Sequence, residues 1–574
     1  MPTTNQSSAM EFNRREFLSF LSMSATAALA WKAFPSVLNE TAWASDAPGL
    51  AGFQVAPFTG LPPLSNDDFV VADGARARIL LRYGDVINQG GDRFGFNNDF
   101  IAFLPLSRGR LVLDQASPEA RTAVEALLWV NHETPMGLLM HGNPGTLQGG
   151  VTKTAEQIRE EQLAIGASIV RIVRDNPHGA WRFGGHHELN RRITALTPIP
   201  YANRVTIRGQ DHAIGTLANC SGGVTPWGTV LTCEENYKEF YGELDGPDSE
   251  DWQSRVTFDA GYDNGWRDQV HHHPWHYGWV VEADPMTGSV RKLVAMGRVS
   301  REGTKVTVAK DGRAVVYSGD DHKGGCIFKF VSRHPNDLSE GQLYAADVKG
   351  GRWVELDWSS QPALRAKFSD QLDVLLHARK AGLAAGATPM DRPEGIDIHP
   401  KTGNVFIALT NNSSVGNHHG SFLCITEKHG DPAATEFTSE AFLVGGPETG
   451  FSCPDNITFD RNGSLWFTTD VSKDKIGVGI YAGYGNNAFF VVPAQGQDAG
   501  RALRFASGPV AAELTGPCFS GDEQTIFLSV QHPGETSVIG QPYTSSWPDG
   551  TPGAMPRSAI VAIDGLPWKK ESMV

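Results

Sequence analysis

The chain has 574 residues, of which 40% are hydrophobic and 20% are charged, and its formal net charge is −15. This is the composition of a globular protein large enough for several domains or one large repeat fold, and its acidic balance argues against a nucleic-acid-binding protein. The 63 Gly, 34 Pro, 29 Phe and 14 Trp residues indicate many tight turns between aromatic-rich strands. We therefore expect an all-β fold.

The first 44 residues have the features of an export signal. Arg14 and Arg15 stand in front of a moderately apolar stretch, and Ala42 and Ala44 form a small-residue cleavage motif. This pattern resembles a twin-arginine signal, which carries folded proteins through the twin-arginine export machinery. We expect residues 1–44 to be removed and the mature protein to be periplasmic or secreted. No later apolar run is long enough to span a bilayer, so we expect no stable membrane anchor.

Six strand–turn–strand segments follow along the rest of the chain, and most of them open with an ionisable residue. We call the residues near the start of their first strands the mouth residues: Asp99, Cys220, Glu302, Glu394, Asp455 and Gly516. Several of the second strands end in further acids: Glu133, Glu234, Glu235, Asp320 and Asp321. Six such repeats predict a six-bladed β-propeller, in which the first strand of each blade lines a central channel. We expect residues 45–574 to form this single domain, with inserted loops and a few short helices.

The mouth residues predict a metal cluster in the channel. If all first strands start at the same end of the channel, four carboxylates and the Cys220 thiol crowd together, and like charges raise each other's pKa unless cations neutralise them. Carboxylates suit Ca²⁺, whereas a thiolate suits iron or zinc, so we expect a mixed cluster. An acid before Gly or Asn can also simply open a turn, which is the simpler explanation of any single copy but not of several in register.

Several of these segments resemble the PhoX-type alkaline phosphatases: "NCSGGVTPWGTVLTCEEN" (219–236), "RPEGIDIHP" (392–400) and "CPDNITFD" (453–460). The resemblance covers nearly all of the mature chain and implies a six-bladed propeller whose channel holds a pair of Fe³⁺ ions and two or three Ca²⁺ ions, joined by a bridging oxo group. Motif by motif, it implies iron ligands at Cys220, Glu302, Glu394 and Asp455, calcium ligands at Glu234 and Glu235, and a phosphate-binding Arg392. The family usually has His where this chain has Arg301.

The resemblance implies an exported, metal-dependent alkaline phosphatase that releases inorganic phosphate from small-molecule phosphomonoesters, and we expect a monomer. Two alternatives stay open: a calcium-dependent propeller hydrolase acting on phosphodiesters, phosphotriesters or lactones, and a propeller that only binds a partner. The Cys220 thiolate argues against the first alternative, and carboxylates in register argue against the second. The "HHHPWH" segment (271–276) suggests zinc but matches no mouth position, so we expect a capping or surface loop. The other cysteines are expected to pack as small hydrophobes.

Overall fold

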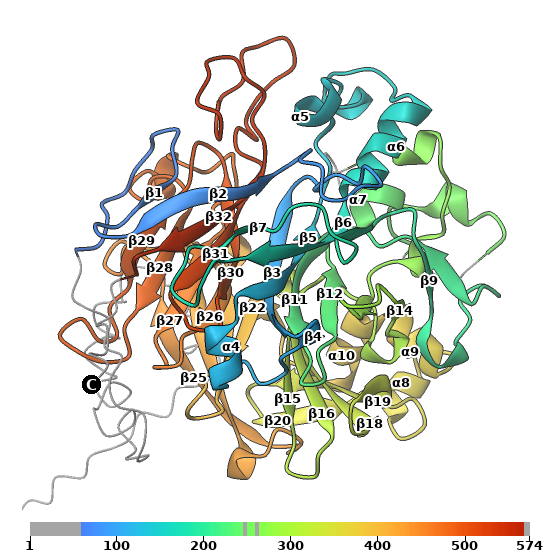
Figure 1. Cartoon of the computed structure of the whole chain (residues 1–574). Coiled ribbons are helices and arrows are strands. Elements are labelled where there is room, and N and C mark those ends of the chain that lie inside the picture. Colours follow the sequence, from blue (N-terminus) through green and yellow to red (C-terminus); the bar gives the residue numbers. More distant parts are fainter. Residues whose placement is uncertain (1–58, 245–248, 259–262, 567–574) are drawn as a thin grey trace, which may run out of the picture.

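Six antiparallel sheets stand around one axis like the blades of a propeller, and short helices lie outside them (Figure 1). The computed structural model describes residues 59–244, 249–258 and 263–566. The predicted six-bladed, all-β propeller with inserted loops is thus confirmed. The predicted export signal, residues 1–44, lies outside the described residues. Within the described part of the chain, none of the helices combines the length and apolar character that a bilayer crossing requires.

Blades 1 to 3 follow one another along the chain, and each runs from an inner strand outward. Blade 1 contains β3 (Asn98–Ser107), β5 (Glu125–His132) and β6 (Gly166–Val173), with edge strands β4 (Arg110–Leu111), β7 (Arg182–Phe183) and β8 (Arg191–Ile193). Blade 2 contains β11 (Asn219–Val224), β12 (Val230–Glu234), β13 (Val280–Ala283) and β14 (Val290–Lys292). Blade 3 contains β15 (Arg301–Val308), β16 (Ala314–Asp320), β18 (Ile327–His334), β19 (Asp337–Asp347) and β20 (Arg352–Glu355).

Blades 4 to 6 complete the ring, and N-terminal strands form the outer edges of the last two. Blade 4 contains β22 (Pro393–Ile398), β23 (Val405–Leu409), β24 (Ser421–Glu427) and β25 (Phe437–Val444). Blade 5 contains β26 (Pro454–Phe459), β27 (Leu465–Thr469), β28 (Ala488–Val492), β29 (Leu503–Ser507) and β1 (Val70–Val71). Blade 6 contains β30 (Glu513–Phe519), β31 (Thr525–Gln531), β32 (Ala559–Asp564) and β2 (Arg76–Arg82). Pairing of β2 with β32 joins the two ends of the chain and closes the ring.

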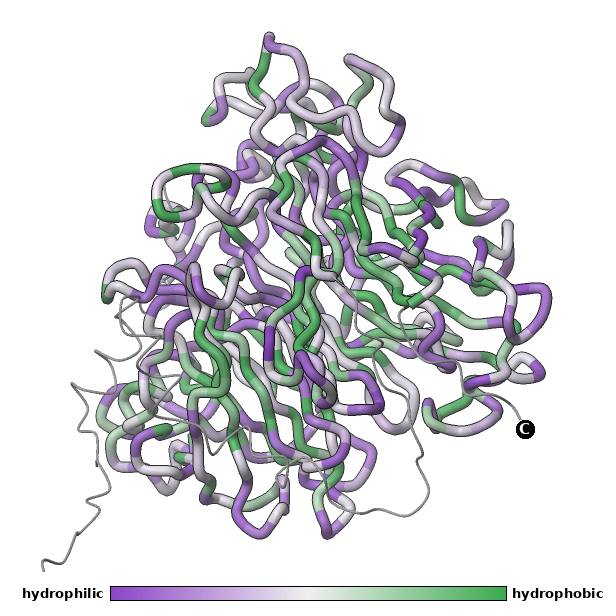
Figure 2. The backbone as a smooth tube through the Cα atoms, turned by 90° about the vertical axis from the view of Figure 1, so that its left-hand side faces the viewer, coloured by the Kyte–Doolittle hydropathy of each residue, from purple (hydrophilic) through white to green (hydrophobic). Residues whose placement is uncertain are grey.

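The core lies between neighbouring blades, so the middle strands are apolar on both faces. One buried cluster joins Leu231 and Val280 of blade 2 to Val316 and Phe328 of blade 3, and similar clusters join the other blades. Figure 2 shows hydrophobic stretches along the strands and hydrophilic residues mainly in the loops. All six cysteines are free. Those outside the mouth positions pack within or against these clusters, as expected: Cys233, Cys326, Cys424, Cys453 and Cys518.

Insertions between strands carry the helices and two small sheets. The helices are α4 (Pro118–Thr122), α5 (Gly137–His141), α6 (Ala155–Ala164), α7 (Lys238–Tyr241), α8 (Pro362–Arg365), α9 (Gln371–Leu376) and α10 (Ala378–Ala385). The small sheets pair β9 (Pro198–Pro200) with β10 (His212–Ile214) and β17 (Lys323–Gly325) with β21 (Met390–Asp391). Helix α6 begins at a capping box, in which Thr154 and Gln157 satisfy each other's backbone N–H groups. Helices α5, α6 and α7 lie close together beyond one end of blades 1 and 2 (Figure 1).

Every inner strand carries the same irregularity at its start. The pairing register with the second strand shifts within the first residues of all six, between Asn98/Ile101, Asn219/Gly222, Arg301/Thr304, Pro393/Ile396, Pro454/Ile457 and Thr515/Cys518. Each mouth residue is the first residue inside this shift. Because a β-bulge locally bends a strand and redirects its side chains, a bulge repeated in six blades gives the six mouth positions a common orientation.

Candidate active site

Five of the six mouth residues line a single cavity. This cavity of about 450 Å³ lies where the inner strands begin, and its walls include Asp99, Cys220, Glu302, Glu394 and Asp455. Each of these side chains is at most 6% exposed. The structure therefore brings together the carboxylates and the thiol that the repeats place in register.

The sixth mouth residue has no side chain because blade 6 leaves no room for one. Gly516 has φ of +57°, and a Cβ at this position would lie 2.4 Å from the main-chain oxygen of Asp99. Gly395, directly after Glu394, is similarly confined, because its Cβ would lie 2.2 Å from the main-chain oxygen of Asp455. Neighbouring inner strands thus touch at the bulges. Blade 6 instead contributes Glu513 to the cavity wall.

A second tier of acids follows the second strands. Glu133, Glu235, Asp321 and Asp470 all line the cavity. Their backbone N–H groups donate in the same way to the carbonyl two residues before a mouth residue, at 2.9 Å for Glu133, 3.0 Å for Glu235, 2.7 Å for Asp321 and 2.9 Å for Asp470. Sequence reasoning missed Asp470 and Glu513. Asp470 occupies the same hairpin position as the other three, so the register of the repeat contained the signal that identifies it.

Glu234 and Asp320, the other acids predicted at strand ends, do not line the cavity. Both carboxylate oxygens of Glu234 accept hydrogen bonds from Lys292 Nζ, at 2.7 and 3.0 Å, and further bonds from the backbone N–H groups of the segment before β13. The two Asp320 oxygens accept hydrogen bonds from Nε and Nη2 of Arg379. Because successive strand residues point to opposite faces, these acids face the blade while their neighbours face the channel. Glu234 therefore drops out of the ligand set that we propose below.

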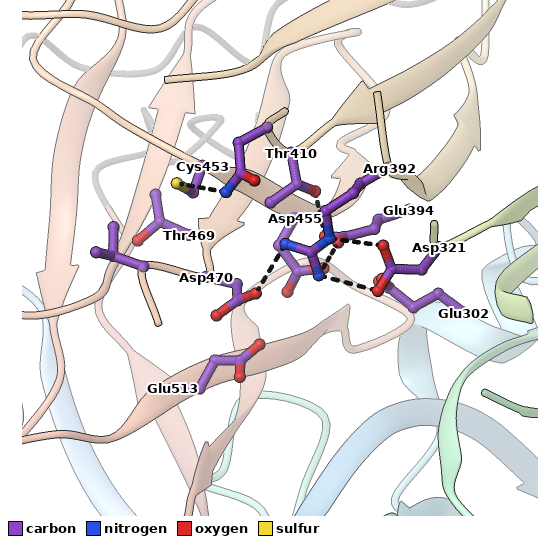
Figure 3. Close-up of polar contacts among 12 residues, drawn as sticks. Glu302, Asp321, Arg392, Glu394, Thr410, Cys453, Asp455, Thr469, Asp470 and Glu513 are labelled. Atoms are coloured by element: carbon purple, nitrogen blue, oxygen red, sulfur yellow. Dashed lines mark hydrogen bonds and ion pairs between the residues drawn. The ribbon is translucent and has the colours of Figure 1, made fainter. Parts of the chain in front are cut away.

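The guanidinium of Arg392 lies among the channel carboxylates (Figure 3). Its Nε and Nη2 donate to the two Asp321 oxygens at 2.7 and 2.9 Å, Nη2 lies 2.5 Å from Glu394 Oε1, and Nη1 lies 3.6 Å from Asp470 Oδ2. Arg392 has φ of +52°, a conformation that costs a non-glycine residue roughly 1–3 kcal/mol. The residues two before the mouths of blades 1, 2 and 5 share this left-handed geometry.

Burial and mutual repulsion dominate the electrostatics of the cavity. Burial first, and then Asp455 and Glu394, raise the pKa of Glu302 well above its usual value. Burial also raises the pKa of the Cys220 thiol, and the nearby Asp99 carboxylate adds to this shift. Burial opposes ionisation of Asp321 too, but the Arg392 guanidinium outweighs it and lowers the pKa of Asp321 to about 2. One cationic side chain therefore balances only part of the negative charge gathered here.

Comparison with known proteins identifies the family. Residues 56–534 match the family described as alkaline phosphatase PhoX. The chain belongs to the PhoX family. The structure of Pseudomonas fluorescens PhoX in complex with vanadate, a transition state analogue, is 28% identical and has a TM-score of 0.75, covering 89% of this chain and 98% of that chain. As a member of this family, the chain is an alkaline phosphatase, a hydrolase of phosphate esters.

Other comparisons add nothing to this assignment. The structure of the Pseudomonas aeruginosa periplasmic gluconolactonase PpgL has a TM-score of 0.29 and 10% identity, covering 63% of this chain and 71% of that chain. This similarity is too weak to support a functional argument. No curated protein sequence matches the chain significantly.

The donor set of this PhoX chain fits bound cations. Oxygen atoms of Glu302, Asp321 and Glu394 all lie within 4.8 Å of one another. Asp99 Oδ1 is buried and, among the described residues, has no hydrogen-bond partner, while Asp99 Oδ2 accepts a hydrogen bond from Cys220 Sγ at 3.2 Å. Crowded carboxylates with unsatisfied oxygens are stabilised by cations. The single thiol among them is the donor that suits a softer metal.

Two further sequence features of the PhoX chain lie away from the cavity. Arg301, where the resemblance implies a His, is fully buried and donates to Ser318 Oγ and to the carbonyls of Met296 and Gly297. Arg301 therefore stabilises the start of blade 3 by hydrogen bonds and does not line the cavity. For the 271–276 segment we expected a capping or a surface loop; His273 and His276 are buried, which argues against the surface loop. No histidine of this segment lines the cavity.

Proposed function

We propose that this alkaline phosphatase is an exported, metal-dependent phosphomonoesterase that releases inorganic phosphate from small-molecule esters in the periplasm or outside the cell. The observation that carries the proposal is the convergence of four carboxylates and one thiol on a cavity that also holds Arg392. A non-catalytic propeller is set aside because the family is one of enzymes.

The residues divide into metal ligands and a phosphate ligand. We propose that Cys220, Glu302, Glu394 and Asp455 bind a pair of Fe³⁺ ions. Glu235 is one of the ligands of two or three Ca²⁺ ions in the same proposal. When bound, such cations neutralise phosphate oxygens and activate the attacking oxygen nucleophile. Cys220 is the residue that distinguishes this set from an all-oxygen calcium site.

Arg392 binds the substrate phosphate in this proposal. A guanidinium carries five N–H donors in a rigid plane, so it can bind a carboxylate on one edge and still donate to a phosphate oxygen. Asp321 occupies Nε and Nη2 and fixes the plane of the group. Nη1 lies 3.6 Å from Asp470 Oδ2, which is too distant for a good hydrogen bond. Nη1 is therefore the donor most available to a phosphate oxygen. The carboxylates around it prevent the guanidinium from swinging away.

The decisive experiment measures hydrolysis of 4-nitrophenyl phosphate at alkaline pH by protein exported through its own signal. We expect turnover that a calcium chelator abolishes and Ca²⁺ restores, together with protein-bound iron that is lost in Cys220→Ser. Turnover that persists after iron is removed, but not after calcium is removed, would instead support the calcium-dependent hydrolase. Folded, metal-loaded protein without turnover of any phosphomonoester would overturn the proposal.

A further inference from the structure

Three lysines line the cavity, and they differ in how their charges are balanced. Lys153 pairs with Glu161 at 2.7 Å, and Lys473 pairs with Glu535 at 2.9 Å. The ammonium of Lys238, at the start of α7, makes no ion pair or hydrogen bond with any described residue, and Nζ lies 5.9 Å from the centroid of the Tyr237 ring. Lys238 is thus the one cavity lysine for which the described part of the chain supplies no carboxylate within ion-pair distance.

The surroundings of Lys238 make the missing anion costly. Arg298 and Arg379 lie near it, and each already has its own carboxylate: Glu243 binds Arg298 at 2.9 and 3.1 Å, and Asp320 binds Arg379. Burial first, and then Arg379, lower the pKa of the Lys238 ammonium, and the more distant Glu243 and Asp320 carboxylates offset only part of this. A partly buried cation beside other cations is unfavourable unless an anion compensates it.

Lys238 lies on the same side of the cavity as the proposed phosphate site. It follows Glu235 closely along the chain, and Glu235 and Asp321 interact, while Asp321 holds Arg392. His322, next to Asp321, also lines the cavity, but its Nδ1 faces the Lys323 carbonyl at 2.9 Å. Burial, followed by Arg379, lowers the His322 pKa. The Lys238 ammonium is therefore the cation that this wall offers to a ligand.

We propose that Lys238 forms a subsite for a second anionic group, a carboxylate or a second phosphate, on the phosphate ester whose scissile phosphate binds at Arg392. This inference rests on the proposed function, because it assumes that a phosphomonoester occupies the cavity. Lys238 then determines specificity without touching the reacting phosphate. An ester that carries a second anionic group supplies the negative charge that Lys238 lacks, whereas an ester whose only anion is the scissile phosphate does not.

The test compares matched esters with metal-loaded enzyme. Glycerol 3-phosphate and 3-phosphoglycerate share a three-carbon skeleton and differ in a carboxylate, and fructose 6-phosphate and fructose 1,6-bisphosphate differ in a phosphate. We expect Lys238→Met to lower kcat/KM for the doubly anionic esters about tenfold, the scale of one charge-assisted hydrogen bond, and to leave the other esters within about twofold. The carboxylate and phosphate pairs show which anion the subsite prefers.

Two variants provide the controls. Lys473→Met also removes one positive charge from the cavity wall, but Lys473 is already paired, so we expect both members of each ester pair to change by the same factor. Lys238→Arg keeps the charge and should retain most of the preference, which separates a specific contact from loss of folding. If Lys238→Met changes both members of each pair equally, or changes neither, the subsite is overturned.

A binding measurement keeps this inference distinct from the proposed function. Phosphonoacetate carries a carboxylate that ethylphosphonate of similar size lacks, and neither compound needs to be hydrolysed. Calorimetry should show tighter binding of phosphonoacetate to the metal-loaded wild-type protein and loss of that preference in Lys238→Met. If no ester is turned over, the proposed function fails while calorimetry still decides on the subsite. Equal binding of the two phosphonates by the wild-type protein would overturn the subsite.

Discussion

Glu234 and Glu235 are adjacent in the sequence, yet the propeller puts them in opposite environments. Glu234 faces the blade, where Lys292 and backbone N–H groups satisfy it. Glu235 faces the cavity, where burial first and then Asp321 and Glu133 raise its pKa. The Asp320–Asp321 pair repeats the arrangement in blade 3, with Arg379 on the blade side. Each pair thus combines an acid that is paired within the blade with an acid that lines the cavity.

The largest expected effect tests the cavity side of this comparison. Glu394→Gln removes a proposed iron ligand that is buried beside Arg392. We expect phosphatase activity to fall about 1,000-fold or more, because the proposed cations provide most of the charge stabilisation of the transition state. Activity with 4-nitrophenyl phosphate and metal content per chain measure the effect. Full iron content together with normal turnover would remove Glu394 from the ligand set.

The next effect separates the two members of one pair. Glu234→Gln leaves the fully buried Lys292 ammonium without its counter-charge, which should cost about 3–5 kcal/mol in the free energy of unfolding. Glu235→Gln should instead leave the stability of chelated protein unchanged or raise it, while lowering activity. Urea unfolding and activity per folded molecule check both variants. Equal losses of stability in the two would show that the pair is not divided as the structure indicates.

A smaller effect concerns the two arginines that bind the Asp320–Asp321 pair, Arg379 and Arg392. Arg392→Lys keeps a positive charge but loses the fork geometry, so we expect kcat/KM to fall about 10- to 100-fold. Arg379→Lys is the matched control, because Arg379 binds Asp320 and does not line the cavity. Its kinetic parameters should stay close to those of the wild type. A similar kinetic loss in both variants would assign Arg392 a structural role.

The repeat pattern predicted the propeller and the convergence of the mouth residues because both follow from local features, alternating strands and a turn at a fixed place. It did not separate Glu234 from Glu235. Their orientation depends on the pairing of β12 and on Lys292, which lies 58 residues later. Glu513 was missed because it lies three residues before the mouth position of blade 6, where no other blade supplies a predicted site residue.

The smallest expected effect is a pH dependence that reverses with metal. In the metal-free protein, burial first and neighbouring carboxylates next raise the pKa values of Glu302, Asp99 and Glu513. Burial also raises the pKa of Glu394, although Arg392 opposes the shift. A carboxyl whose pKa is raised by folding contributes stability at low pH, and this contribution is lost as pH rises above the unfolded value, near 4.3 for Glu. Chelated protein should therefore melt at lower temperature at about pH 8 than at about pH 5.

Bound cations reverse this pH dependence of stability, because they bind the ionised carboxylates and their binding releases protons. Adding Ca²⁺ should raise the melting temperature more at high pH than at low pH, and this difference should shrink in Glu302→Gln. The same substitution in chelated protein should flatten the pH dependence, since one of the acids that resists ionisation is gone. If chelated protein were most stable at high pH, the cavity acids would be compensated within the protein, and the contrast between channel-facing and blade-facing acids would fail.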